Sequence, residues 1–112
     1  MSRLNIGADL LLDTDYSTSE VKTGATWTDG KPIYRKVFVL NTIVTNNWTV
    51  YDSDTTHVPV RVYGRIGTYF IPFYQPDAST YWFILNEKSY KCGAGMGSYT
   101  GYIIAEYTKT TD

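Results

Sequence analysis

The chain has 112 residues and a formal net charge of −1, from 10 basic and 11 acidic side chains. A chain of this length forms one domain, residues 1–112, and can bury a single core without a metal or a disulfide. The near-neutral charge excludes a basic field that would attract nucleic acid or an anionic membrane surface. Aromatic residues make up 16% of the chain, with 11 Tyr and 3 Trp, and they favour both strands and recognition surfaces.

Cys92 is the single cysteine, so an internal disulfide is excluded and neither a cofactor nor a cysteine-based metal site is expected. We expect Cys92 to be a small buried residue of a protein that matures in a reducing cytoplasm. No apolar run approaches the ~20 residues that a membrane helix needs, and the N-terminus lacks a secretory pattern. Membrane insertion is therefore not expected.

The first third of the chain contains one alternating segment and one polar segment. Residues 4–12 alternate apolar and polar side chains, which predicts a strand, although the leucine-rich end is also compatible with a short helix. Residues 14–31 are rich in Ser, Thr, Asp and Gly and are predicted to form a long surface segment pinned by Trp27. Within this segment, residues 28–32 predict a tight turn in which Gly30 has a positive φ.

Residues 33–40 form a predicted strand that is apolar on both sides, with four apolar residues in a row at positions 37–40. Such a strand must be covered on both sides, so one face is expected to meet the core and the other a neighbouring layer or subunit. We assign a subunit interface to the following apolar residues of this strand and the last one: Ile33, Phe38, Leu40 and Ile104.

The remaining strands are short and are separated by Gly and Pro residues. Residues 58–62 alternate, and Pro59 cannot donate to a ladder, which predicts an edge strand or an unpaired first turn. Further strands are predicted at 69–74, 81–85 and 99–109, the last after a glycine-rich stretch at 93–97 that is a flexible hairpin turn or a close backbone approach. About six to eight short strands without a helical period predict an all-β antiparallel sandwich or jelly roll.

Two phrases of the chain resemble C-terminal domains of phage and prophage tail proteins. The first is Trp27-Thr28-Asp29-Gly30-Lys31-Pro32-Ile33-Tyr34-Arg35-Lys36, preceded by Tyr16-Ser17-Thr18-Ser19-Glu20. The second is the ending, Tyr102-Ile103-Ile104-Ala105-Glu106-Tyr107-Thr108-Lys109-Thr110-Thr111-Asp112. The resemblance brackets residues 16–112, while residues 41–98 match no phrase of these domains apart from Ile71-Pro72 with its aromatic neighbours.

The resemblance implies a homotrimeric β-structured fibre tip, the C-terminal part of a longer tail protein, that adheres to a saccharide or protein of the host cell surface. Its place would be the virion tail, with synthesis in the host cytoplasm and release by lysis, and other tail proteins would be further partners. Surplus apolar surface at residues 37–40 agrees with such a trimer, because it requires a partner.

Saccharide binding requires a flat aromatic face for the C–H side of the sugar, beside planar amide or carboxylate groups. Aromatic residues close to the predicted loops, with their polar neighbours, meet this requirement. The candidate ligand-binding residues are Trp48, Tyr51, Tyr74, Gln75, Asp77, Tyr90 and Tyr99.

No catalytic residues are predicted. His57 is the only histidine and no Gly-x-Ser-x-Gly motif is present, so triad chemistry is not expected; His57 is a satisfied strand residue, or an ion ligand on a trimer axis. Asp13-x-Asp15 and Asp52-x-Asp54 lack the longer loop of a calcium site. An acid pair for glycoside cleavage would have to come from Asp52, Asp54, Asp77, Glu87 or Glu106, for which turn or surface roles are sufficient.

Three hypotheses for the function follow. The first is a tail-fibre receptor-binding domain that adheres, as a trimer, to a host cell-surface saccharide, with avidity from several weak sites. The second is a structural domain that caps or trimerises a fibre without a ligand of its own. The third is a fragment of a surface-polysaccharide hydrolase.

Overall fold

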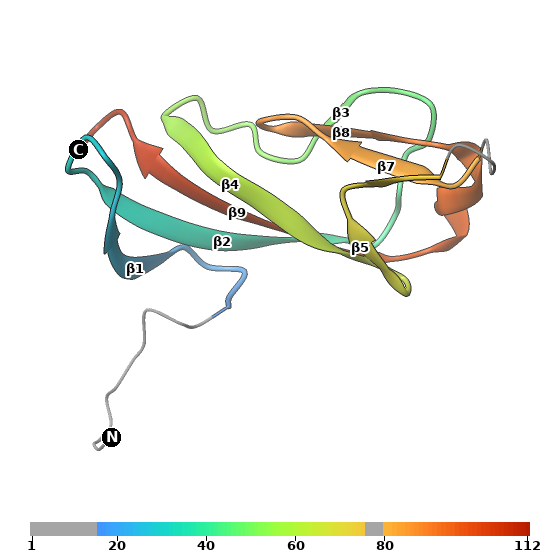
Figure 1. Cartoon of the computed structure of the whole chain (residues 1–112), viewed down its shortest axis with the longest axis horizontal. Helices are drawn as coiled ribbons and strands as arrows, with labels where there is room; N and C mark the ends of the chain where they lie inside the picture. Colours follow the sequence, from blue (N-terminus) through green and yellow to red (C-terminus); the bar gives the residue numbers. More distant parts are fainter. Residues whose placement is uncertain (1–15, 76–79) are drawn as a thin grey trace, which may run out of the picture.

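The computed structural model describes residues 16–75 and 80–112. In this part of the chain, nine antiparallel strands form two sheets that pack on each other (Figure 1). The prediction of an all-β antiparallel sandwich is therefore confirmed. The strand predicted at residues 4–12 lies outside the described residues.

The first sheet has five strands in the spatial order β1-β2-β9-β4-β5. Its central strand, β9, pairs with β2 on one side and with β4 on the other over almost its whole length. Isoleucine, tyrosine and threonine, which favour the extended conformation, dominate β9. The bounds are β1 Val21–Thr26, β2 Pro32–Leu40, β4 His57–Ile66, β5 Tyr69–Ile71 and β9 Gly101–Lys109.

The second sheet has four short strands in the order β3-β8-β7-β6. The bounds are β3 Thr49–Val50, β6 Phe73–Tyr74, β7 Trp82–Leu85 and β8 Ser89–Cys92. A short 3-10 helix, η1 (Ala94–Ser98), connects β8 to β9. Figure 1 shows that the second sheet lies over the end of the first sheet near β5, and not over the end where the C-terminus lies.

The hydrophobic core lies between the two sheets. Leu40 and Ile103 contribute from the first sheet, and Phe83 and Tyr90 from the second, with the rings of the last two stacked at 5.0 Å. Cys92 is fully buried in the same cluster, as expected for a small filler residue. Burial of large apolar side chains is the main favourable term in folding, so this half of the sandwich stabilises the fold.

Strand alternation divides the first sheet into an inner face, which points toward the second sheet, and an outer face, which points away from it. In β2, Phe38 and Leu40 point inward and pack in the core, whereas Val37 and Val39 point outward. The inference that this strand is apolar on both faces is correct. The assignment of Phe38 and Leu40 to a subunit interface is wrong, because the chain's own core covers their side chains.

Part of the polar segment at residues 14–31 is a strand. β1 occupies it and pairs with β2, where the Thr23 hydroxyl donates to Ile33 O at 2.9 Å. A strand at a sheet edge buries little, so its apolar alternation is weak and its Thr-rich composition resembles that of a loop. The predicted turn is confirmed by Gly30, whose φ is 85°. Trp27 is 43% exposed and does not pin the segment to the core.

Three further predictions concern the short strands and the residues that connect them. Residues 69–74 form two strands instead of one, because the chain passes from the first sheet to the second at Pro72. Residues 93–97 are not a hairpin turn, since β8 and β9 belong to different sheets; the alternative of a close backbone approach is confirmed, because a Cβ at Gly93 would lie 2.4 Å from Thr80 O. At Pro59 the first turn of β4 is paired with β9, so the alternative of an unpaired turn is wrong, whereas the edge alternative holds for this part of β4, because β5 pairs only with residues 64–66.

The alternation in β2 predicts opposite outcomes for two neighbouring substitutions. Leu40→Glu places a carboxylate in the core, where Leu40 is 9% exposed, and is expected to cost roughly 3 kcal/mol or more of the free energy of unfolding. Val39→Glu, at 53% exposure, is expected to change it by less than about 1 kcal/mol. Urea unfolding followed by circular dichroism at low protein concentration measures both values, and equal losses would contradict the assignment of faces.

Candidate functional site

The outer face of the first sheet is formed by the outward residues of four adjacent strands. From one end of the sheet to the other, β4 presents Arg65, Tyr63 and Arg61, and β9 presents Tyr102, Ile104 and Glu106. The register pairs these residues in rows, Arg65 with Tyr102, Tyr63 with Ile104 and Arg61 with Glu106. β2 completes the rows with Val39, Val37 and Arg35, and β5 adds Phe70 beside Arg65.

A charged network closes one end of the outer face. The Glu106 carboxylate, 12% exposed, accepts a hydrogen bond from Arg35 Nε at 3.0 Å and from the Tyr63 hydroxyl at 3.1 Å. Arg61 lies further away, with 3.9 Å between its terminal nitrogen and Glu106 Oε1. Burial and the hydrogen bond with the Tyr16 hydroxyl raise the pKa of Tyr63, as does the Glu106 charge. Tyr63 therefore acts as a neutral hydroxyl in this network.

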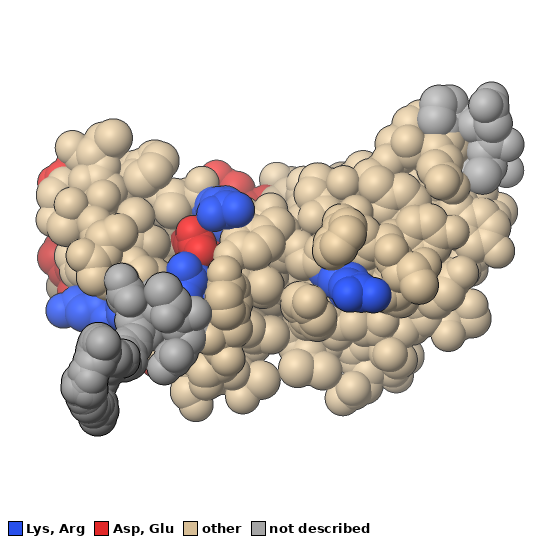
Figure 2. Space-filling model, turned by 60° about the horizontal axis from the view of Figure 1, so that its bottom comes forward, with Lys and Arg blue, Asp and Glu red and all other residues tan. Residues whose placement is uncertain are grey.

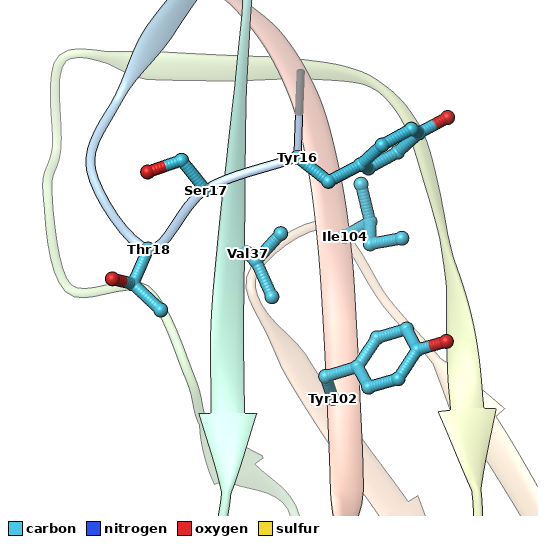
Figure 3. Close-up of a pocket in the computed structure, with 6 residues that line it drawn as sticks. All are labelled: Tyr16, Ser17, Thr18, Val37, Tyr102 and Ile104. Carbon is cyan, nitrogen blue, oxygen red and sulfur yellow. The ribbon is translucent and has the colours of Figure 1, made fainter. Parts of the chain in front are cut away.

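The middle of the outer face holds a cavity of about 360 Å³. Figure 3 shows Ile104 between the rings of Tyr16 and Tyr102, with Val37 beside it. Ser17 and Thr18 complete the lining, with their hydroxyl groups pointing away from Ile104 in Figure 3, so the hydroxyl groups of the cavity are those of Tyr16 and Tyr102. The chain is held here because Val37 N donates to Ser17 O at 2.8 Å and the Arg35 guanidinium lies 4.5 Å from the centre of the Tyr16 ring. The cavity thus combines an apolar floor, two aromatic rings and hydroxyl groups.

Beyond the cavity, the outer face exposes large apolar side chains. Phe70 is 75% exposed, Val39 53% and Tyr102 38%. Figure 2 shows this side of the molecule as a broad uncharged area in which charged groups stand at separate points. Val39 and Tyr102 are register partners, and Arg65 lies between Tyr102 and Phe70. Exposed large apolar side chains gathered on one face make it a candidate interaction site.

A second polar cluster lies on the inner face, at the end that the second sheet does not cover. Asp52 and His57 are both buried, with His57 Nδ1 2.7 Å from Asp52 Oδ2, and the His57 ring stacks on Tyr107 at 3.8 Å. His57 Nε2 faces carboxylates, Asp54 at 3.2 Å and Glu20 at 3.7 Å. In a Ser-His-Asp triad a nucleophilic hydroxyl would stand at that nitrogen. Carboxylates occupy that position here, so these contacts attach the loop before β4 to the sheet.

The two aspartates of this cluster also make turn contacts. Asp52 Oδ1 accepts from Asp54 N at 3.0 Å, and Asp54 Oδ1 accepts from the backbone and hydroxyl of Thr56. These contacts use the oxygens that a calcium ion would need. Within residues 16–75 and 80–112, no group of three or more His, Cys, Asp or Glu side chains is placed to hold a metal ion. Asp13 and Asp15 lie outside this range.

The structure does not gather the ligand-binding residues predicted from the sequence into one site. Trp48 and Tyr74 are 50% and 67% exposed, but they lie near β3 and on β6, at opposite edges of the second sheet. Three strand spacings separate these edges, which is about 14 Å. Gln75 follows Tyr74 and is exposed, and Asp77 lies outside the described residues.

The other three predicted aromatics are held by the protein itself. Tyr90 is 2% exposed and its hydroxyl accepts from Val44 N at 3.1 Å, so its assignment to a ligand surface is wrong. Tyr51 is half-buried, and its hydroxyl donates to Glu87 O at 2.8 Å. Tyr99 is half-buried, and its ring packs edge-on against Tyr69 at 5.9 Å. A loop-proximal position in the sequence does not distinguish these roles.

Of the residues assigned to a subunit interface, two lie on the outer face. Ile104 is 7% exposed and forms the floor of the cavity, and Ile33 is partly exposed at the start of β2. Among the carboxylates considered for glycoside cleavage, Glu106 lies on the outer face, Asp52 and Asp54 lie in the inner cluster, and Glu87 lies in the β7–β8 turn. They are therefore distributed over different elements.

Sequence reasoning missed Tyr16, Arg65, Phe70 and Tyr102 as site residues. A signal for part of this set is present, because Arg61, Tyr63 and Arg65 alternate with Val62 and Gly64, which is the period of one strand face. Nothing in the sequence indicates that this row lies beside Tyr102, since their contact depends on the register between β4 and β9.

Comparison with known proteins finds no match. No protein-family model, no curated protein and no solved structure matches the chain. Within the described residues, no helix has the length and apolar character required to cross a membrane.

The inner cluster predicts a loss of stability in acid. Burial raises the pKa of Glu20, but hydrogen bonds from Lys109 and Tyr107 outweigh this effect and hold the pKa below its ordinary value of 4.5. A carboxyl with a lowered folded-state pKa stabilises the fold above its unfolded-state pKa, and this contribution disappears as the pH falls through the folded-state pKa. Glu20→Gln is therefore expected to destabilise the protein at pH 7 and to match the wild type more closely near pH 3.

Urea unfolding of both proteins between pH 7 and pH 3 measures this effect. A stability difference that stays constant over the whole range would contradict the role given to the Glu20 charge.

Proposed function

We propose that the chain is a receptor-binding module of a phage tail fibre or related tail protein, and that it adheres to a saccharide of the host cell surface through the cavity on the outer face. The observation that carries the proposal is the lining of this cavity, in which the rings of Tyr16 and Tyr102, with their phenolic hydroxyls, stand over the apolar floor of Ile104 (Figure 3). Aromatic faces suit the C–H side of a sugar ring and hydroxyl groups suit its polar edge.

The two phrases that resemble phage tail proteins support the proposal through their position. The phrase from Trp27 to Lys36 leads into β2 and the ending contains β9, and these strands pair with each other. Residues 41–98 supply β4 and β5, and with them Arg61, Tyr63, Arg65 and Phe70 of the outer face. Framework and ligand-specific residues would thus come from different parts of the chain.

A shallow site on one copy binds weakly, and we include a homotrimer in the proposal because several copies raise the overall binding by avidity. The partners would be the host saccharide, two further copies of the chain and other tail proteins. An adhesion module needs no catalytic group, and the inner cluster of Asp52 and His57 has a structural role in this account.

The second candidate function is a structural fibre cap. It is favoured by the exposed apolar side chains of Val39, Phe70 and Tyr102 together with the arginines of the same face. Aromatic residues and arginine are enriched in protein–protein interfaces, whereas lysine is depleted. In this case another subunit would cover the outer face, and no saccharide would bind there.

Tyr102→Ala is the substitution that tests the proposal, with Tyr74→Ala on the second sheet as the matched control. Removing a stacked aromatic ring that contributes about 1 kcal/mol to the binding free energy lowers the affinity roughly fivefold. We expect Tyr102→Ala to weaken the labelling of bacterial cells and glycan arrays at least this much, and Tyr74→Ala to leave it unchanged. Light scattering on the same samples measures the mass.

The alternatives give different results. A weaker signal with Tyr74→Ala alone would move the ligand site to the second sheet. A protein that labels nothing and loses its trimeric mass with Tyr102→Ala would favour the fibre cap. Reducing sugar released from cell envelopes would favour the hydrolase, and a monomer that labels nothing would reject both adhesion and capping.

A further inference from the structure

Among the described residues, the arginine and lysine side chains lie on different parts of the molecule. All three described arginines, Arg35, Arg61 and Arg65, project from the outer face. The six described lysines lie elsewhere, on the inner face, in turns and on the second sheet; they are Lys22, Lys31, Lys36, Lys88, Lys91 and Lys109. Arginine differs from lysine because its planar fork pairs with carboxylate and phosphate through two parallel hydrogen bonds and stacks on aromatic rings.

Each of these arginines lies over an aromatic ring. The guanidinium carbon is 4.5 Å from the ring centre of Tyr16 for Arg35, 4.3 Å from that of Tyr63 for Arg61, and 5.6 Å from that of Phe70 for Arg65. Stacking orients the guanidinium before a ligand arrives, so less conformational entropy is lost on binding.

The charge of the outer face is not balanced within the described residues. Glu106 is the one acidic side chain among the outward residues of β2, β9, β4 and β5 in this part of the chain, where the same face carries three arginines, two of them in the row of Glu106. Glu106 pairs closely with Arg35, while the Arg61 side chain is 66% exposed and stays 3.9 Å away. Arg65 is exposed, and its guanidinium makes one hydrogen bond within the described residues, from Nε to Gly67 O at 3.0 Å.

The cavity lies over β2 and β9, beside β4, and along the strands it lies between the rows of these two exposed cations. Tyr102, which lines the cavity, is the register partner of Arg65, and Ile104 in its floor is followed two residues later by Glu106 in the Arg61 row. Arg61 and Arg65 are four residues apart on one strand, about 13 Å, which a single sugar ring does not span. A ligand that uses both guanidiniums is therefore a chain of several sugars.

We propose that the outer face selects an anionic saccharide chain, with a sugar ring in the cavity against Tyr102 and carboxylate or phosphate groups on Arg65 and Arg61. This inference rests on the proposed function and defines its ligand class. The charge complementarity is local, since the chain as a whole has a net charge of −1. Among the described residues, the local excess of guanidinium over carboxylate is what distinguishes an anionic from a neutral saccharide here.

The test uses probes that differ only in charge. A galacturonic acid tetramer is compared with its methyl ester, and phosphorylated mannan with plain mannan, so that the two arms distinguish carboxylate from phosphate. We expect the anionic member of at least one pair to bind to the full chain and its neutral counterpart to bind at least about tenfold more weakly. A factor of about ten in affinity corresponds to the loss of one charge-assisted hydrogen bond.

Arg65→Gln is expected to remove this preference, with a loss of about tenfold in affinity for the anionic probe. Arg65→Lys keeps the charge without the planar fork and is expected to have an intermediate affinity. Lys22→Gln, an equal loss of charge at an exposed position of β1, is the control and should leave binding unchanged. Thermal unfolding verifies that each variant is folded.

Three outcomes overturn the inference. If anionic and neutral probes bind equally and Tyr102→Ala weakens both, the proposed function remains and the anionic ligand class is rejected. If Lys22→Gln weakens binding as much as Arg65→Gln, the preference is a general charge effect. If no probe binds and Tyr102→Ala changes the oligomeric mass, the outer face is an interface between copies, and both proposals are rejected.

Discussion

The hydrogen bonding of β9 to β2 on one side and to β4 on the other determines both faces of the first sheet. β9 carries Ile103, Ala105 and Tyr107 inward and Tyr102, Ile104 and Glu106 outward, so one strand supplies the middle row of the core and of the candidate site. A shift of one residue in either pairing would exchange the two sets, because the side-chain period of a strand is two. The register is therefore the constraint on which the fold and the outer face both depend.

Two glycines permit this register. A Cβ at Gly64 would lie 2.1 Å from Tyr102 O, and a Cβ at Gly101 would lie 2.1 Å from Arg65 O, so β4 and β9 approach each other at these points as only glycine allows. The same approach places Arg65 beside Tyr102 on the outer face. The close backbone contact between β4 and β9 therefore determines where the Arg65 guanidinium lies on the outer face.

The sandwich is stabilised by different interactions at its two ends. Near β5 the second sheet and η1 cover the first sheet with apolar side chains such as Phe83 and Met96, both fully buried. At the other end, a loop covers the inner face with Asp52 and His57, and the His57 ring stacks on Tyr107. Burial raises the pKa of Glu20, but the hydrogen bonds that it accepts from Tyr107 and Lys109 hold the pKa below its ordinary value. This end of the sandwich therefore loses stability as the pH falls through the folded-state pKa of Glu20.

The sequence by itself determined the all-β class, the turn at Gly30, the edge position of the strand at Pro59 and the two-sided apolar character of residues 33–40, because these depend on local composition and on a period of two. Only the tertiary structure decided that Phe38 faces the core and Val39 the outside, that Tyr90 is buried while Tyr102 lines a cavity, and that β1 is a strand. Phe38 and Val39 are equally apolar neighbours, so their side chains are sorted by which face the second sheet covers. The rows of the outer face join residues from four strands separated by up to 71 positions in the chain, from Arg35 to Glu106. Such contacts arise from strand register, which no local pattern in the sequence encodes.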